Sequence, residues 1–224
     1  MFKRFLLRFA MLFLTLEIAR AENLSHLMLQ CAPSVHPITL GALIRTESGG
    51  YPYALSDDGP QHLPWQARKN LLRSFYPKTL KEATDIAKML IHNGHFVGIG
   101  LTQVNSQHLS RLGLTVEQLL DPCTNLRAGV WILTHFYIKA LRQYKNPQSA
   151  LLAAISAFNT GDFKSGFANG YVQKVMINAG ITVPLLNITK PRRRLTTPAS
   201  PAPSGHVNPR RQFLQAKFSK LEFE

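Results

Sequence analysis

The sequence predicts a mainly α-helical fold, because apolar residues recur at helical spacing in most periodic segments and strand-type alternation is nearly absent. Turn or capping residues mark the ends of these segments, as helix boundaries usually require. The chain has 224 residues, 45% of them hydrophobic, which is enough for one domain of ordinary size with appendages. The β-structure that we expect is at most a short hairpin or an extended loop.

The first predicted helix begins near Pro37, which suits the first turn of a helix, and ends at the pair Gly49-Gly50. One face of this helix carries residues at positions i, i+3, i+4 and i+7, namely Leu40, Leu43, Ile44 and Glu47. Glu47 is therefore expected on the buried face and in the last turn.

Further helices are predicted over about residues 80–93, 115–120, 125–144, 148–158 and 171–179. The segment from Thr79 to Glu82 has the form of a capping box. Residues 94–105 are rich in glycine and β-branched residues, and they are predicted to form the hairpin or extended loop. The run from Ser56 to Pro60 is predicted to be a turn, because Ser, Asp, Gly and Pro all favour turns.

Both ends of the chain differ in composition from the middle. Residues 1–21 have the form of a secretory signal peptide: basic residues precede a short apolar run, and Ala19-Arg20-Ala21 is a small-x-small cleavage site. A retained N-terminal anchor is the alternative. We expect residues 22–186 to fold as one domain and residues 187–224 to form a disordered tail rich in proline and basic residues. No other segment is apolar over a membrane-spanning length, so the exported domain is expected to be soluble.

Cys31 and Cys123 are the two cysteines of the chain. In an exported protein such a pair favours a disulfide over a metal site, and two free buried thiols are the alternative. Closing a loop of this length stabilises the folded state by about 4 kcal/mol in the chain-entropy model.

The formal net charge is +14, and the basic residues are concentrated at the two ends. The predicted domain is only mildly basic, which fits an acidic polymer or an anionic surface as well as it fits DNA. No zinc-finger, RNA-recognition or homeodomain pattern is found, so we expect no nucleic-acid partner. Docking of the tail to a protein partner or an anionic membrane remains an alternative to a solvated tail.

Glu47 is the candidate catalytic residue. Apolar surroundings raise the pKa of a carboxyl group, and the negative end of a helix dipole raises it further. A carboxylic acid that stays protonated near neutral pH is suited to general acid catalysis. An exposed glutamate at a frayed helix end is the alternative that position alone leaves open.

Amide and aromatic side chains are placed in loops between the predicted helices. Gln103 and Asn105 follow Gly98 and Gly100, which allow close approach of a ligand or another backbone segment. At the end of a later helix, Phe158 and Asn159 combine a flat ring with an amide, a suitable wall for a sugar ring with an N-acetyl group. Tyr171 opens the last helix. One acid with neutral hydrogen-bonding groups suits a substrate rich in hydroxyls and amides.

Other catalytic classes lack their residues. No Ser-His-Asp arrangement, phosphate-binding loop or metal-spaced His and Cys cluster is present. His92 and His95 are three residues apart without a nearby carboxylate in the sequence, so surface or loop positions are expected rather than zinc ligation. The sequence thus indicates no metal and no cofactor.

Taken in order, several of these runs resemble the soluble lytic transglycosylase family over about residues 29–180. They are Glu47-Ser48, the run from Gly100 to Asn105, Ala157-Phe158-Asn159 and Tyr171-Val172. The runs that start at Cys31 and at Asp121 resemble the branch found with type IV secretion and conjugation systems. The resemblance implies a lysozyme-like helical fold, cleavage of peptidoglycan, a periplasmic location and secretion-system partners.

The resemblance also implies roles for individual residues. Glu47 would protonate the bond between N-acetylmuramic acid and N-acetylglucosamine and then, as a carboxylate, close a 1,6-anhydro ring. Ser48 and Tyr171 would orient or tune Glu47. Gln103, Asn105, Phe158 and Asn159 would hold the sugar. The chain departs from the family at Thr102, where Met is common, and at Phe158, where Tyr is common.

Two alternatives to a lytic transglycosylase remain at this point. A lysozyme-type hydrolase that works by inversion needs a second carboxylate about 6.5–9.5 Å from the acid to activate water, and Asp57 or Asp58 could reach. A wall-binding or assembly factor would act mainly through residues 187–224 and would not need Glu47. DNA binding through the same tail is a weaker alternative, because no base-reading motif accompanies the charge.

Overall fold

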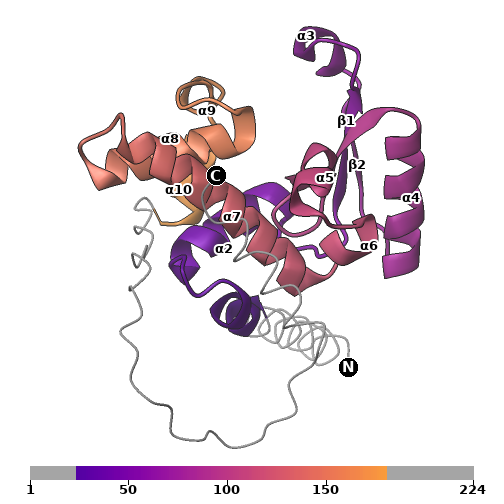
Figure 1. Cartoon of the computed structure of the whole chain (residues 1–224), viewed down its shortest axis with the longest axis horizontal. Helices are drawn as coiled ribbons and strands as arrows, with labels where there is room; N and C mark the ends of the chain where they lie inside the picture. The colour runs from indigo at the N-terminus through magenta and orange to yellow at the C-terminus, as the bar shows by residue number, and fades with distance from the viewer. Residues whose placement is uncertain (1–23, 181–224) are drawn as a thin grey trace, which may run out of the picture.

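A computed structural model of the chain describes residues 24–180, and it confirms the predicted mainly α-helical fold class. Its helices accompany a small four-stranded antiparallel sheet, and the sheet lies at one side of the molecule (Figure 1). The predicted signal peptide at 1–21, the predicted tail at 187–224 and the predicted domain end at 181–186 lie outside the described residues.

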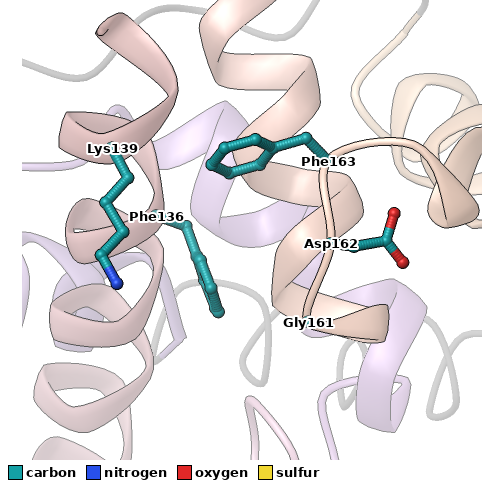
Figure 2. Close-up of a pocket in the computed structure, with 5 residues that line it drawn as sticks. All are labelled: Phe136, Lys139, Gly161, Asp162 and Phe163. Atoms are coloured by element: carbon teal, nitrogen blue, oxygen red, sulfur yellow. The ribbon is translucent and has the colours of Figure 1, made fainter. Parts of the chain in front are cut away.

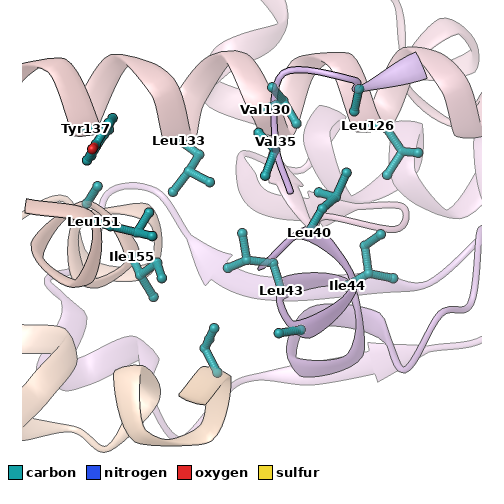
Figure 3. Packing of buried hydrophobic residues seen from close by; sticks show 14 of the residues in the cluster. Val35, Leu40, Leu43, Ile44, Leu126, Val130, Leu133, Tyr137, Leu151 and Ile155 are labelled. Atoms are coloured by element: carbon teal, nitrogen blue, oxygen red, sulfur yellow. The ribbon is translucent and has the colours of Figure 1, made fainter. Parts of the chain in front are cut away.

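The helical half is built around α7 (Pro122–Leu141), which runs across α2 (Pro37–Ser48) and α8 (Pro147–Thr160), as Figure 3 shows. The last helix, α10 (Tyr171–Asn178), packs against α2 and α8. The inward residues of these elements form the larger core, which includes Val35, Leu40, Leu43, Ile44, Leu126, Val130, Leu133, Tyr137, Leu151 and Ile155.

Helix α7 begins three residues before the predicted start because of its cap. The Asp121 side chain accepts a hydrogen bond from the Thr124 amide at 2.9 Å, and Pro122 occupies the first turn. An aspartate cap followed by proline is a strong helix start, since proline lacks the N–H that would remain unpaired there. Asp121 and Pro122 thus fix the start of α7.

The sheet has the strand order β2-β1-β3-β4. Its strands are β1 (Leu55–Pro60), β2 (Arg73–Phe75), β3 (His95–Ile99) and β4 (Val104–Asn105). The predicted hairpin at 94–105 corresponds to β3 and β4, whereas β1 and β2 make the sheet larger than the sequence indicated. Helices α4 (Leu80–His92) and α6 (Val116–Leu119) help to cover it and form a second, smaller core with it.

The prediction of a turn over Ser56–Pro60 is wrong, because this run is β1. Leu55 pairs with Ile99 and Asp57 pairs with Val97, so the strand is held on the β3 side as well as on the β2 side. The turn preference appears only locally, where the register shifts between Asp57 and Pro60 and Gly59 has φ 80°. Pairing on two sides outweighs local turn preference in this segment.

Short elements complete the described part of the chain: α3 (Trp65–Arg68), the 3-10 helix η1 (Ser106–His108), α5 (Leu109–Leu112) and α9 (Ser165–Ala168). Residues 24–31 are also helical. Within residues 24–180, no helix combines the length and the apolar character that crossing a membrane requires.

The predicted disulfide is confirmed. Cys31 and Cys123 are bonded, with their Cα atoms 5.3 Å apart, and the link closes a sequence separation of 92 residues. It ties the helical residues 24–31 to the first turn of α7, next to the larger core. The first helical segment is therefore fixed to the helix around which the domain is built.

Candidate active site

Glu47 lies in the last turn of α2, as predicted from the helical pattern. Gly49 ends the helix in the left-handed conformation, with φ 63°, and its N–H donates to the Arg45 carbonyl. Only glycine adopts this conformation without a Cβ penalty, so the helix stops directly after the acid. The Glu47 side chain is half-buried and keeps some contact with solvent.

Tyr171 contacts the Glu47 carboxyl from the C-terminal part of the domain. Its hydroxyl donates a hydrogen bond to Glu47 Oε1, and it is the first residue of α10. A second link between the same helices joins Asn178 Nδ2 to Thr46 Oγ1 at 2.9 Å. Burial first, and then the nearby Glu47, raise the pKa of Tyr171 well above its usual value, so the hydroxyl keeps its proton.

The surroundings of Glu47 raise its pKa to about 7. Burial is the largest cause, because removal of water disfavours the charged carboxylate. The hydrogen bond from Tyr171 lowers the pKa, and the negative charge of Asp58 raises it again. Near neutral pH the group therefore exchanges readily between its acid and base forms.

Ser48 fixes the end of α2 to the sheet side of the site. Its hydroxyl donates to the Leu101 carbonyl at 2.8 Å and accepts from the Gly50 amide at 3.2 Å. The hydroxyl hydrogen bonds of Ser48 thus hold the loop opposite Glu47, rather than the Glu47 carboxyl itself. This effect on the site is indirect, through the relative position of α2 and residues 100–103.

Gln103 braces the turn between β3 and β4. It has an unusual positive φ of 47°, and its Nε2 donates to the carbonyls of Ala54 at 3.0 Å and Gly100 at 2.8 Å. A Cβ at Gly98 would collide with the Gln103 side chain and with Ser56 Oγ, so glycine is required there. The glycines that suggested close approach of a ligand therefore also permit close packing of the protein on itself.

Asn125 holds the same turn from α7, and sequence reasoning missed it. Its Nδ2 donates to the carbonyls of Ile99 at 2.8 Å and Leu119 at 2.9 Å, and its Oδ1 accepts from the Thr102 amide at 2.8 Å. Thr102 Oγ1 also donates to it, and both residues are only 1% exposed. An amide among buried apolar residues of a long helix was the available signal, since a buried polar group needs partners.

Asp57, one of the two candidates for a water-activating carboxylate, forms ion pairs with Arg73 and His95. Its Oδ2 accepts from Arg73 Nη2 at 2.6 Å, its Oδ1 lies 2.7 Å from His95 Nδ1, and it is 1% exposed. Burial raises its pKa, but the hydrogen bonds of Arg73 and His95 outweigh this and lower it overall. The expectation that His95 has no carboxylate partner was wrong, because β1 and β3 pair across 38 residues of sequence.

Asp58 differs from Asp57 in the direction in which its surroundings shift the carboxyl pKa. Its carboxylate accepts from Ser56 Oγ at 2.9 Å and from Asn105 Nδ2 at 3.1 Å, and its pKa is raised, chiefly by burial. It is close enough to Glu47 to raise the pKa of that residue. The structure therefore brings Asn105 and Asp58 together beside the candidate acid.

Phe158 and Asn159 lie near the end of α8. Phe158 is half-buried and packs against both hydrophobic cores, so it sits where the helical half meets the sheet. Asn159 is exposed, and its Oδ1 accepts from Asn169 Nδ2 at 3.1 Å. The ring is thus at the junction of the two halves, while the amide lies at the surface.

Comparison with known families matches residues 26–180 to the model described as the transglycosylase SLT domain. The chain belongs to the transglycosylase SLT family. The family resemblance predicted from the ordered motifs is therefore confirmed, and the match includes Glu47, Gln103, Phe158 and Tyr171.

Several curated proteins are similar to the chain over most of its length. The protein named virB1 of Agrobacterium fabrum is 39% identical over 158 residues, which are 70% of this chain and 59% of that protein. The type IV secretion system protein virB1 of Brucella abortus is 35% identical over 187 residues, 81% of this chain and 74% of that protein. The virB1 protein of Rhizobium radiobacter is 36% identical over 167 residues, 74% of this chain and 64% of that protein. No solved structure matches the chain.

A separate pocket of the SLT domain, of about 330 Å³, opens between α7 and the turn after α8 (Figure 2). The rings of Phe136 and Phe163 line it together with Lys139, and the Asp162 carboxylate is directed away from it. That carboxylate accepts from the amides of Lys164 and Ser165, both at 2.8 Å. Glu47 does not line this pocket, so we place the candidate site at Glu47 and Tyr171.

Metal ligation finds no support in the part of the SLT domain that the structure describes. Among residues 24–180, no three His, Cys, Asp or Glu side chains are grouped so that they could hold a metal ion. The His95 ring is instead engaged with Asp57. The chemistry available at the site is therefore that of Glu47, Asp58 and the hydrogen-bonding groups around them.

Proposed function

We propose that the protein is a peptidoglycan lytic transglycosylase with Glu47 as its catalytic residue. It would cleave the β-1,4 bond between N-acetylmuramic acid and N-acetylglucosamine and leave a 1,6-anhydro end. The observation that carries this proposal is the Glu47 carboxyl, whose pKa of about 7 allows it to act first as an acid and then as a base. Membership of the transglycosylase SLT family supports it independently.

In the first step, Glu47 donates its proton to the glycosidic oxygen while the bond from that oxygen to C1 breaks. The substrate's own N-acetyl oxygen stabilises the positive charge at C1. In the second step, the Glu47 carboxylate takes the proton of the C6 hydroxyl, and the C6 oxygen bonds to C1 to close the anhydro ring. No water is added, and Glu47 returns to its protonated form.

The remaining predicted residues have supporting parts in this proposal. The Tyr171 hydroxyl donates to the carboxyl in its charged form and orients it. Ser48 keeps the end of α2 against the loop at residues 100–103. Gln103 would offer its carbonyl oxygen, since its amide nitrogen is already paired with backbone carbonyls. Asn105, Phe158 and Asn159 would contact the sugar rings.

Mass spectrometry of digested sacculi tests the proposal. Purified protein is incubated with sacculi, and the released muropeptides are analysed before and after chemical reduction. We expect products with 1,6-anhydro ends, which borohydride leaves unchanged. Products with reducible ends would contradict the proposal and support the hydrolase.

Asp58 gives the hydrolase a specific structural argument as the second candidate. The Asp57 carboxylate is already engaged with Arg73 and His95, whereas Asp58 is held by neutral donors and is close enough to interact electrostatically with Glu47. An inverting hydrolase needs a second carboxylate to activate water, and Asp58 is the candidate for that role.

Replacing Asp58 by Asn separates the two candidates. In a lyase we expect activity at pH 6 to stay within about fivefold of the parent, because Asp58 takes no part in proton transfer. Removal of its negative charge lowers the pKa of Glu47, so the loss of activity on the alkaline side should move to lower pH. The measurement is a pH–rate profile on sacculi from pH 5 to 8. A loss of about a hundredfold or more at every pH would favour the hydrolase.

The cellular setting is also part of the proposal. The Brucella relative is named a type IV secretion system protein. That likeness supports a location in the periplasm of a Gram-negative envelope, where the protein would open peptidoglycan locally for such an apparatus. Glycan strands would be its substrate and components of the apparatus its partners, without nucleic acid.

A further inference from the structure

Residues 64–78, which we call the arm, expose several large apolar side chains on the sheet side of the molecule. The exposed fractions are 52% for Trp65, 47% for Leu71, 45% for Leu72 and 65% for Tyr76. In Figure 1 the part of the arm that contains α3 stands beyond the end of the sheet, well away from α8 and α9. Such a concentration of exposed apolar residues is typical of a binding surface.

The arm is also cationic. It carries Arg68, Lys69, Arg73 and Lys78, of which Arg73 is paired with Asp57, and the sequence has no carboxylate between Asp58 and Glu82. The Arg68 guanidinium lies over the Phe96 ring at 4.9 Å and near the Trp65 ring at 5.6 Å. Cations beside exposed aromatic rings favour ligands that combine carboxylates with apolar groups.

Both ends of the arm are attached to residues beside the candidate site. The Tyr76 ring packs edge-on against Tyr51 at 5.8 Å, and the Tyr51 hydroxyl donates to the Pro77 carbonyl at 2.8 Å. Tyr51 follows Glu47 by four residues. At the other end, Arg68 Nη1 donates to the Asp58 carbonyl at 3.1 Å. These contacts join the arm to segments that adjoin Glu47 and Asp58 in the sequence, so its position is fixed relative to the candidate site.

We propose that the arm binds the acidic peptide stems of the glycan strand that Glu47 cleaves. This inference rests on the proposed function, because it takes peptidoglycan as the substrate. Peptide stems branch from the muramic acid units and carry free carboxylates beside apolar alanine side chains. Their charge and their apolar groups complement the cations and the exposed rings of the arm.

Binding to sacculi tests the proposal without digestion when every protein carries Glu47→Gln. Surface plasmon resonance measures the half-saturation concentration on immobilised intact sacculi and on immobilised glycan strands whose stems have been removed with an amidase. Immobilisation is needed because a sacculus without its peptide cross-links comes apart into soluble strands. The double change Lys69→Ser and Lys78→Ser should weaken binding to intact sacculi about three- to tenfold, by the usual strength of exposed charge pairs. It should leave binding to the stem-free strands unchanged.

Matched controls separate the arm from general charge and apolar effects. Lys145→Ser with Lys164→Ser removes the same charge from exposed positions in the helical half and should not change binding. Trp65→Ala should weaken binding to intact sacculi, while Leu141→Ala, at a residue that is 41% exposed, should not. Thermal melting confirms that each variant is folded.

Three results would overturn the inference. One is equal binding of the arm variants and the parent to intact sacculi. Another is an equal loss on intact sacculi and on stem-free strands, which would indicate contact with the sugars. The third is equal binding of the parent to intact sacculi and to stem-free strands together with arm-dependent binding to vesicles of phosphatidylglycerol. Product analysis of the protein with Glu47 intact reports separately on the proposed reaction, so either conclusion can fail while the other stands.

Discussion

Replacing Glu47 by Gln is expected to reduce the release of muropeptides from sacculi at least about a hundredfold, the usual contribution of a general acid. Glutamine keeps the shape of the side chain and can still accept the hydrogen bond from Tyr171. It has no proton to donate to the glycosidic oxygen and cannot take one from the C6 hydroxyl. Initial rates of soluble product release measure the effect.

The same variant should be more stable than the parent at alkaline pH. The pKa of Glu47 is raised from 4.5 to about 7, so the stability that comes from its protonated form is lost as pH rises through 7. By this shift, Glu47→Gln should gain up to about 3 kcal/mol in unfolding free energy at pH 8 and almost nothing at pH 4. Denaturant unfolding at the two pH values measures the difference.

Asp85→Asn is the matched control, because Asp85 is exposed on α4, forms its ion pair with the exposed Lys81 and lies outside the site. It should retain both turnover and stability at each pH. Turnover of Glu47→Gln within about tenfold of the parent would remove Glu47 from its catalytic assignment. A loss of turnover without any gain in stability at pH 8 would instead show that burial does not raise its pKa.

Removing the disulfide with Cys31→Ser and Cys123→Ser is expected to lower the unfolding free energy by about 4 kcal/mol. The link closes a sequence separation of 92 residues, and its loss frees the unfolded chain by that amount in the chain-entropy model. The melting temperature should fall by roughly 10 °C for a domain of this size. Thermal unfolding followed by circular dichroism measures the change.

Reduction provides the internal control for this experiment. The parent treated with reductant should melt close to the double variant, and the variant itself should not respond to reductant. Melting of the parent and the variant within about 2 °C of each other would mean that the link adds little to the folded state.

Local sequence signals predicted the helices well because each signal acts within a few residues. Gly49 ends α2 where the pattern ended, and Thr79 caps α4 by accepting from the Glu82 amide. The β1 strand was missed because its stability comes from pairing partners elsewhere in the chain, with Asp57 opposite Val97 on one side and Arg73 on the other. Local turn preference therefore gave the wrong result there.

The features of the candidate site likewise divide into those that local sequence signals predict and those that depend on distant segments. The helical face on which Glu47 lies was predictable from spacing, and the family motifs indicated Tyr171. The contact of Asp58 with Asn105, and the network from Asn125 to Thr102, could not be predicted, because each joins segments that are distant in sequence. Thr102, where the family commonly has Met, is buried against α7.

The hydrogen bond between Tyr171 and Glu47 joins residues 124 positions apart. Because a chain is synthesised from its N-terminus, Glu47 is made 124 residues before Tyr171. A partly made chain therefore carries the acid without the hydroxyl that orients it.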